Sequence, residues 1–301
     1  MRTNDTPNNI LISYAFCKSK SSREVLAMYL NEARRGRMNI MFDSGAFSAF
    51  RSGATMLLED YCRFLKENSE HVEKYVMLDK IGNEEQTKRN FESMVSGGLR
   101  PMYVWTVKSQ DEAFLKDALS VNADVCVAGG ANTKGEWLIQ RFQRVAKIGA
   151  GAAKIHGLAF VTFPKMLQCG LASVDSSSWE AGALRFGTMC YFVYDRGMKG
   201  FCRESFVSEI KKRNPIAVKF SNELRLTAKD ILTDANFVSV RGIPYYASVR
   251  AYMAMQKYCY RRGLRLFFAS LMNKSQFRAI EWWNENWNSP NYQNFRKYME
   301  G

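Results

Sequence analysis

Histidine is scarce in this sequence, with two among 301 residues. The seven cysteines are an odd number, are scattered, and contain no CxxC pair. These shortages argue against a disulfide framework and against metal sites built on thiolate or imidazole. No segment approaches the roughly 20 apolar residues that cross a bilayer, and MRTNDTPNN at the start lacks the apolar core of a secretion signal. We therefore expect a soluble, cytoplasmic protein that has no metal site and does not associate with membranes.

The sequence also lacks GxGxxG and GxxxxGK[ST], the loops that bind phosphates in many open α/β sheets. It contains instead an alternation of apolar runs and amphipathic segments, which predicts βα units around a parallel sheet. The predicted strands are 9–16, 38–42, 74–78, 101–107, 124–128, 153–160 and 171–174. We therefore expect the α/β class and a (β/α)8 TIM-like barrel, with residues 1–190 forming its main part.

Positive charge is concentrated in the last third of the chain. The net charge is +14, and residues 196–301 contain 19 basic and 8 acidic residues. Such a concentration of positive charge favours binding of a polyanion such as nucleic acid. A basic surface can also do no more than keep a protein soluble. We expect residues 191–301 to contact nucleic acid and to complete the barrel, either inserted into it or appended to it. Within this region, 190–202 predicts a hairpin and 264–268 predicts the eighth strand.

Polar residues and glycines follow most of the predicted strands. Asp43, Asp79 and Asp175 follow the second, third and seventh strands, a Gly129–Gly130 pair follows the fifth, and His156–Gly157 lies in the sixth. In a barrel these positions meet at the carboxyl face, where barrel enzymes have their active sites. Taken singly, each aspartate can be a helix cap, the glycines a tight turn, and the histidine a buried core residue. Their common placement at strand ends favours a site.

The motifs carry a resemblance to a known family. The segment DSGAF (43–47) closely resembles the DSGGF signature of the tRNA-guanine transglycosylases. The family's other features follow in order: an acidic residue at the next strand end, a GG turn, a G turn, and an Asp that precedes Arg and GT. DSGAFSAF, HGLAF and SVDSSSW are closer still to the phage and bacterial branch that acts on DNA, the DNA 7-deazaguanine transglycosylases. The resemblance covers about residues 10–190 and implies the host cytoplasm if the protein is phage-encoded.

The resemblance implies a role for each motif residue. Asp175 matches the nucleophile that attacks C1′ of the target nucleotide, and Asp43 matches the general acid and base. Asp79 matches the acid that recognises the guanidine-like edge of the base. Further base-binding residues implied in this way are Ser44, Phe47, Gly129, Gly130, His156 and Gly157. Candidate nucleic-acid-binding residues, from their positions and from the basic, aromatic character of the last third, are Ser176, Ser177, Arg185, Lys211, Lys212, Arg213, Arg250, Arg261 and Arg262.

The implied reaction exchanges guanine in DNA for a free 7-deazaguanine, such as 7-cyano-7-deazaguanine, and needs no cofactor. Its partner is DNA with a flipped-out or single-stranded guanine, and both a monomer and a homodimer stay open. One departure from the family is plain: the tRNA enzymes hold a structural zinc with a Cys cluster and a His, and this chain has neither there. Three alternatives stay open: the same exchange on tRNA, a non-catalytic nucleic-acid-binding barrel, and a hydrolase that releases the base to water.

Overall fold

The computed structural model describes residues 7–106, 108–129, 135–194 and 196–300. The chain folds into two compact units. The sheet unit comprises Thr6–Ser176 and Cys259–Met272, and the helical unit contains Ser177–Tyr258 and Asn273–Gly301. The structural boundary thus lies directly after the seventh predicted strand, and the chain re-enters the sheet unit near its C-terminal end. The roles assigned from the sequence to 1–190 and 191–301 stay predictions.

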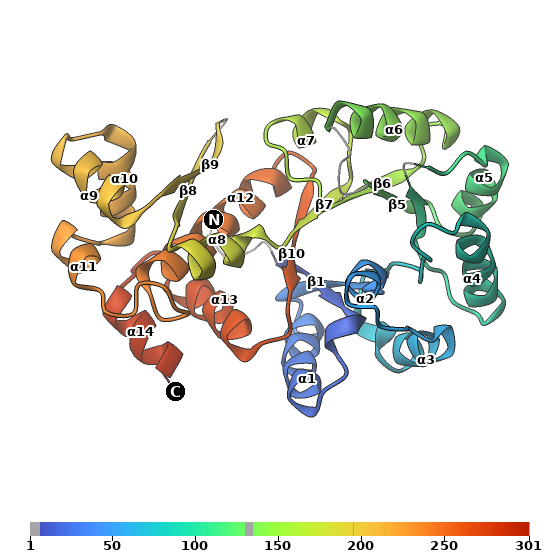
Figure 1. Cartoon of the computed structure of the whole chain (residues 1–301), viewed down its shortest axis with the longest axis horizontal. Helices are drawn as coiled ribbons and strands as arrows, with labels where there is room; N and C mark the ends of the chain where they lie inside the picture. The colour runs from blue at the N-terminus through green and yellow to red at the C-terminus, as the bar shows by residue number, and fades with distance from the viewer. Residues whose placement is uncertain (1–6, 107, 130–134, 195, 301) are drawn as a thin grey trace. The chain divides into compact units, whose positions relative to one another are not determined.

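Eight parallel strands form the sheet of the sheet unit (Figure 1). They are β1 (Asn8–Ser13), β2 (Met38–Asp43), β3 (Lys74–Tyr75), β4 (Tyr103–Thr106), β5 (Asp124–Ala128), β6 (Lys154–Leu158), β7 (Ser173–Ser176) and β10 (Arg265–Ser270). Their order is β3-β2-β1-β10-β7-β6-β5-β4. All seven strands predicted from the apolar runs are present, and 264–268 provides the eighth. The α/β class and the parallel sheet are therefore confirmed.

The sheet curls but is not closed into a barrel by a regular ladder. Its two edge strands are β3 and β4, and the residues that flank them make a single parallel bridge, Val76 with Met102. There the Met102 N–H donates to Tyr75 O over 2.8 Å, and the Met77 N–H donates to Met102 O over 3.0 Å. The fold is therefore TIM-like, with a curled parallel sheet and helices after most strands. The closed (β/α)8 barrel expected from the sequence is not formed as a continuous ladder within the described residues.

Helices follow most of the strands in the sheet unit. They are α1 (Lys20–Arg34), α2 (Ala46–Ser52), α3 (Leu58–Asn68), α4 (Glu84–Ser96), α5 (Glu112–Val121), α6 (Gly135–Ile148) and the short α7 (Lys165–Gln168), with 3₁₀ turns at Tyr14–Phe16 and Ser69–His71. Short polar side chains begin three of them: Ser19, Asn83 and Asp111 each accept a hydrogen bond from the backbone N–H three residues further on. Such caps satisfy an N–H that has no partner within the helix and so fix where the helix starts.

Side chains from the helices also reach the carboxyl ends of the strands. The Tyr61 hydroxyl of α3 donates to Val76 O over 2.7 Å. Arg141 of α6 donates from Nη2 to Thr106 O over 2.9 Å, at the end of β4. Because these carbonyls lie where the strands end, the bonds tie the loops of this edge to the helix layer and keep the strand ends in place.

The helical unit begins with α8 (Ser178–Phe186) and an antiparallel hairpin of β8 (Met189–Val193) and β9 (Gly197–Phe201). The hairpin predicted at 190–202 is thereby confirmed. Six helices follow: α9 (Arg203–Lys211), α10 (Pro215–Leu224), α11 (Ala228–Thr233), α12 (Ile243–Tyr260), α13 (Lys274–Asn286) and α14 (Tyr292–Glu300). Among all the helices in the described ranges, none is long and apolar enough to span a bilayer.

The Trp- and Asn-rich segment EWWNENWNSPNYQNF (281–295) contributes to an aromatic core. The ring of Tyr246 lies 4.6 Å from that of Trp283, 5.5 Å from Tyr292 and 5.1 Å from Phe295. The Trp283 Nε1–H donates to Tyr246 O over 3.0 Å, so the buried indole keeps a hydrogen-bond partner. These contacts join α12, α13 and α14 into one packed layer.

Candidate active site

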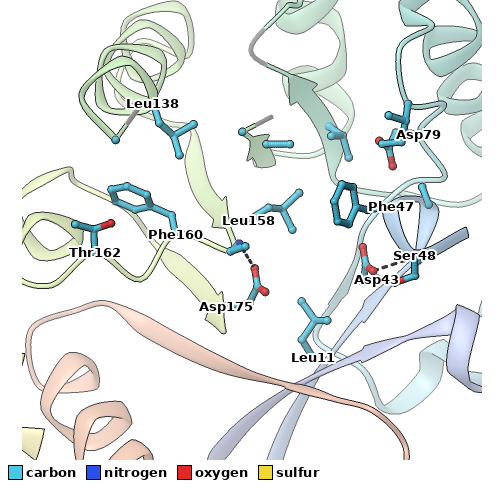
Figure 2. Close-up of a pocket in the computed structure, with 18 residues that line it drawn as sticks. Leu11, Asp43, Phe47, Ser48, Asp79, Leu138, Leu158, Phe160, Thr162 and Asp175 are labelled. Carbon is cyan, nitrogen blue, oxygen red and sulfur yellow. Dashed lines mark hydrogen bonds between the residues drawn. The ribbon is translucent and has the colours of Figure 1, made fainter. Parts of the chain in front are cut away.

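A cavity of about 490 Å³ opens at the carboxyl ends of the strands of the sheet unit (Figure 2). Its wall contains three carboxylates, Asp43, Asp79 and Asp175. The other lining residues are Leu11, Gly45, Ala46, Phe47, Ser48, Ile81, Val104, Ala128, Gly129, Gly135, Leu138, Leu158, Ala159, Phe160 and Thr162. Figure 2 shows the carboxylates of Asp43 and Asp175 pointing into the same space. A concave, largely apolar site of this volume with a few converging polar groups suits a small planar ligand.

Asp43 ends β2 and is held by the turn that follows it. The Gly45 N–H donates to its Oδ2 over 2.9 Å. Gly45 has a left-handed backbone with φ of +80°, and a Cβ added there would lie 2.5 Å from Ala15 Cβ and from Ser13 Oγ. Both the conformation and the close approach require glycine, so the central residue of DSGAF is explained by the turn that carries Asp43.

Replacing Gly45 by alanine is expected to lower the free energy of unfolding by about 1–3 kcal/mol more than replacing Gly82 by alanine. Gly82 has the same backbone, with φ of +79°, but a Cβ there meets nothing within 4 Å. The Gly82 variant therefore costs only the left-handed strain, about 1 kcal/mol. Urea unfolding of the two variants measures the difference, and equal losses would show that the contact with Ser13 and Ala15 carries no energy.

The two carboxyl groups on the β2 and β3 side are harder to ionise than ordinary aspartates. Enclosure by protein raises the pKa of Asp43 to about 6, with a further contribution from the negative charge of Asp175. Enclosure likewise raises the pKa of Asp79 to about 7, and here the neighbouring charge is that of Asp43. Near neutral pH the pocket can therefore hold and give up a proton, which is what a general acid and base needs.

Asp175 lies on β7 and is 8% exposed. Its Oδ1 accepts the Ala159 N–H over 2.7 Å, the contact drawn as a dashed line in Figure 2, and lies 3.3 Å from His156 Nε2. Ala159 has φ of +53°, an unfavourable backbone for a residue with a Cβ. Backbone strain of this kind concentrates at functional sites, where surrounding structure maintains it. The turn after β6 thus presents its amide to the carboxylate.

The predicted base-binding residues occupy different depths. Phe47 is 55% exposed and lines the cavity, as does Gly129. Ser44 is fully buried, and its Oγ accepts the Ala46 N–H at the start of α2. Gly130 lies outside the described residues.

Neither of the two residues predicted from β6 lines the cavity. His156 is fully buried and contacts Ser173 and Asp175, while Leu158, two residues further along the same face of β6, lines the cavity. Gly157 faces the helix layer, where a Cβ would come within 3.2 Å of Phe142. Their direct contact with a base stays a prediction, and the structure gives each a packing or hydrogen-bonding role.

The predicted nucleic-acid-binding residues are mostly exposed, but two are enclosed. Ser176 is 2% exposed. Arg250 lies over the rings of Trp283 and Trp287, at 5.1 and 4.2 Å, and donates to Trp287 O over 3.1 Å. Such stacking and bonding leave its guanidinium less available to a phosphate than the sequence suggested. The exposed members of the set are Ser177, Arg185, Lys211, Lys212, Arg213, Arg261 and Arg262.

Several wall residues of the cavity were not singled out from the sequence. Leu11 lies on β1, Leu138 on α6, and Ile81, Phe160 and Thr162 on loops. They are apolar or small residues within strands, helices and turns, and no spacing rule distinguishes them from ordinary core positions. Ala159 and Phe160 had a local signal, since both belong to the HGLAF segment (156–160), which starts within β6 and ends in the turn after it.

Within the described ranges, no three His, Cys, Asp or Glu side chains are grouped so that they could hold a metal ion.

Comparison of the chain with protein-family models finds no match. A search of curated proteins also finds no match.

Proposed function

We propose that the protein exchanges guanine in DNA for a free 7-deazaguanine through a covalent bond between Asp175 and C1′ of the nucleotide. The observation that carries the proposal is the convergence of Asp43, Asp79 and Asp175, from three separate strand ends, on one cavity. A base exchange needs a nucleophile, a proton carrier and a group that recognises the base, and three carboxylates in different surroundings can divide these tasks. In this proposal the curled sheet is a (β/α)8 barrel, which the Val76–Met102 bridge supports.

The proposed steps follow from the chemistry of glycosyl transfer. A carboxylate oxygen of Asp175 bonds to C1′ as the bond from C1′ to the guanine nitrogen breaks, through an oxocarbenium-like state. The leaving guanine keeps the electron pair and takes a proton from Asp43. The incoming 7-deazaguanine returns a proton to Asp43 as its nitrogen bonds to C1′ and releases Asp175. One glycosidic bond is broken and one is made, and no proton is gained or lost overall.

Recognition of guanine is assigned to Asp79. As a carboxylate it accepts hydrogen bonds from N1–H and from the exocyclic amino group, a pattern that adenine does not offer. The exposed Phe47 ring lines the same cavity as Asp79 and suits stacking on the face of a base (Figure 2). The 19 basic residues of 196–301 favour a nucleic acid strand as the source of the nucleotide.

Binding of free guanine is expected to release protons into solution near pH 7. Asp79 has a pKa of about 7 and is therefore partly protonated there, whereas the bound base requires its ionised form. Isothermal titration calorimetry in two buffers with different ionisation enthalpies measures the number released. The release should fall several-fold about one pH unit higher, where Asp79 is mostly ionised and the free base is still neutral. Proton uptake, or binding that releases none at either pH, would contradict the role given to Asp79.

Incubation with radiolabelled guanine and either duplex DNA, single-stranded DNA or tRNA tests the proposal. Label that enters DNA alone supports the proposal. Label that enters tRNA alone would mean that the substrate of the exchange is tRNA and not DNA. Release of free base without incorporation would instead indicate a hydrolase. Nucleic-acid binding that survives replacement of all three aspartates, with no exchange by the wild type, would indicate a binding protein.

A further inference from the structure

A connected set of polar groups lies behind the cavity, on β6 and β7. His156 and Ser173 are paired directly across the two strands, and Asp175 comes two residues after Ser173 and so faces the same side. His156 Nδ1 lies 2.8 Å from Ser173 Oγ, and Nε2 lies 3.3 Å from Asp175 Oδ1. His156 is fully buried and Ser173 is 1% exposed. Strand register thus places the imidazole between a hydroxyl and the proposed nucleophile.

Both contacts to the Asp175 carboxylate reach the same oxygen. Oδ1 accepts the Ala159 N–H and faces His156 Nε2, and within the described residues no hydrogen bond reaches Oδ2. Asp175 also lines the cavity. The two oxygens of one carboxylate are therefore unequal: Oδ1 is held by the protein, and Oδ2 is left for a ligand.

The hydrogen on the imidazole can be assigned from its neighbours. A carboxylate only accepts hydrogen bonds, so Nε2 must carry a hydrogen to make the contact with Oδ1 favourable. In the neutral ring Nδ1 is then an acceptor, and the Ser173 hydroxyl, which can rotate, donates to it. A ring protonated only on Nδ1 would direct the Nε2 lone pair at the carboxylate of Asp175, which is repulsive.

We propose that His156 is a positioning residue that holds Oδ1 of Asp175 and thereby selects Oδ2 as the oxygen that bonds to C1′. This inference rests on the proposed base exchange. In the covalent intermediate the Oδ2–C1′ bond forms while the bond from C1′ to the guanine nitrogen breaks. Oδ1 becomes the carbonyl oxygen of the ester and still accepts from His156 and Ala159. When the new base bonds to C1′, the Oδ2–C1′ electron pair returns to the carboxylate.

A matched pair of amides at position 156 tests the inference. Glutamine can place its NH2 group where Nε2 lies, whereas the shorter asparagine reaches only the position of Nδ1. His156→Gln is expected to keep kcat within a few-fold of wild type, and His156→Asn and His156→Phe to lower kcat roughly 10- to 100-fold with little change in KM for the free base. Equal kcat for all three variants and wild type would overturn the inference, as would a loss confined to KM.

Two controls make the result interpretable. Circular dichroism and guanine binding show whether each variant keeps its fold and its cavity. If both His156→Asn and His156→Phe fail to fold, Ser173→Ala serves instead, because it leaves the imidazole in place and removes only the hydroxyl that fixes its tautomer. That variant is expected to lower kcat about 3- to 10-fold, and an unchanged kcat would overturn the inference.

The tautomer provides a readout that does not depend on catalysis. Long-range ¹H–¹⁵N NMR of the imidazoles should show hydrogen on Nε2 of His156, and the His71→Gln variant assigns the signal because the chain has only two histidines. Hydrogen on Nδ1 alone would overturn the inference whatever the activity. If wild type shows the expected tautomer but exchanges no base in any polymer, the proposed function is wrong.

Discussion

Replacement of Asp175 by asparagine is expected to slow base exchange by roughly 10⁴-fold or more and to abolish the covalent adduct with DNA. Asparagine keeps the shape of the side chain, and its amide oxygen can still accept the Ala159 N–H that holds Oδ1 over 2.7 Å. It has no carboxylate oxygen to bond to C1′. The loss therefore separates nucleophilic chemistry from the packing of a residue that is only 8% exposed.

The adduct is measured on denaturing gels and by mass spectrometry of the digested protein, and exchange by the incorporation of labelled guanine. Asp124→Asn is the matched control, because Asp124 is also a strand aspartate but lies at the start of β5. It pairs with Lys74 over 2.6 Å at the amino ends of the strands, away from the cavity. It should retain exchange. An adduct that persists in Asp175→Asn, or in Asp175→Ala, would assign the nucleophile to another residue.

Replacement of Asp79 by asparagine is expected to weaken guanine binding by roughly 10²- to 10³-fold. The carboxylate can accept from two N–H groups of the base, whereas the asparagine amide offers one acceptor and turns a donor toward the other N–H. The affinity of free guanine, from calorimetry, is the direct measurement. The Asp43→Asn variant keeps Asp79 and should bind the base far better while losing exchange, so the two variants separate recognition from proton transfer.

The same Asp79 variant should be more stable than wild type above pH 7. Burial raises the pKa of Asp79 to about 7 in the folded protein, so the protonated form is favoured by folding. The stability that this gives is fully present below the pKa of an ordinary aspartate and is lost as pH rises through 7. Asparagine is neutral at every pH and avoids that loss, which we estimate at about 1–2 kcal/mol after allowing for solvent screening.

Urea unfolding of wild type and Asp79→Asn at about pH 4 and about pH 8 tests the sign, because the two proteins should differ only at the higher pH. Asp117→Asn, an exposed position on α5, provides a control for general effects of removing a negative charge. A variant less stable than wild type at the higher pH would mean that Asp79 is held ionised in the fold. The expected result, in which Asp79→Asn binds guanine more weakly but is more stable, would mean that Asp79 serves base binding at a cost to the stability of the fold.

The strands and the three carboxylates could be predicted from the sequence because both depend on local pattern. Apolar runs located β1 to β7, and the rule that parallel strands end at one edge brought Asp43, Asp79 and Asp175 together. The contact of His156 with Asp175 could not be predicted, because it depends on the register of β6 against β7, which places His156 opposite Ser173. No local pattern specifies that register.

The surroundings of Arg250, in the basic last third, could not be predicted from the sequence, for a physical reason. An arginine among aromatic residues has the same local sequence whether it faces a phosphate or stacks within the protein. Arg250 does the latter, against Trp283 and Trp287. Burial also lowers the pKa of its guanidinium, which marks it as a part of the packed unit. Lys211, Lys212 and Arg213 remain exposed, so the prediction of nucleic-acid contact now rests more on them.

The position of β10 between β1 and β7 affects how the chain folds during synthesis. β10 pairs with β1 through Leu11 and Ala269, and with β7 through Asp175 and Phe267, so it is the strand that joins the two halves of the sheet. At typical rates of translation it emerges on the order of 10–50 s after β1. During that time β1 and β7 each expose an unpaired edge, to which other chains can add. We therefore expect the nascent protein to be prone to aggregation until Arg265–Ser270 is made, and a product truncated before β10 to be insoluble.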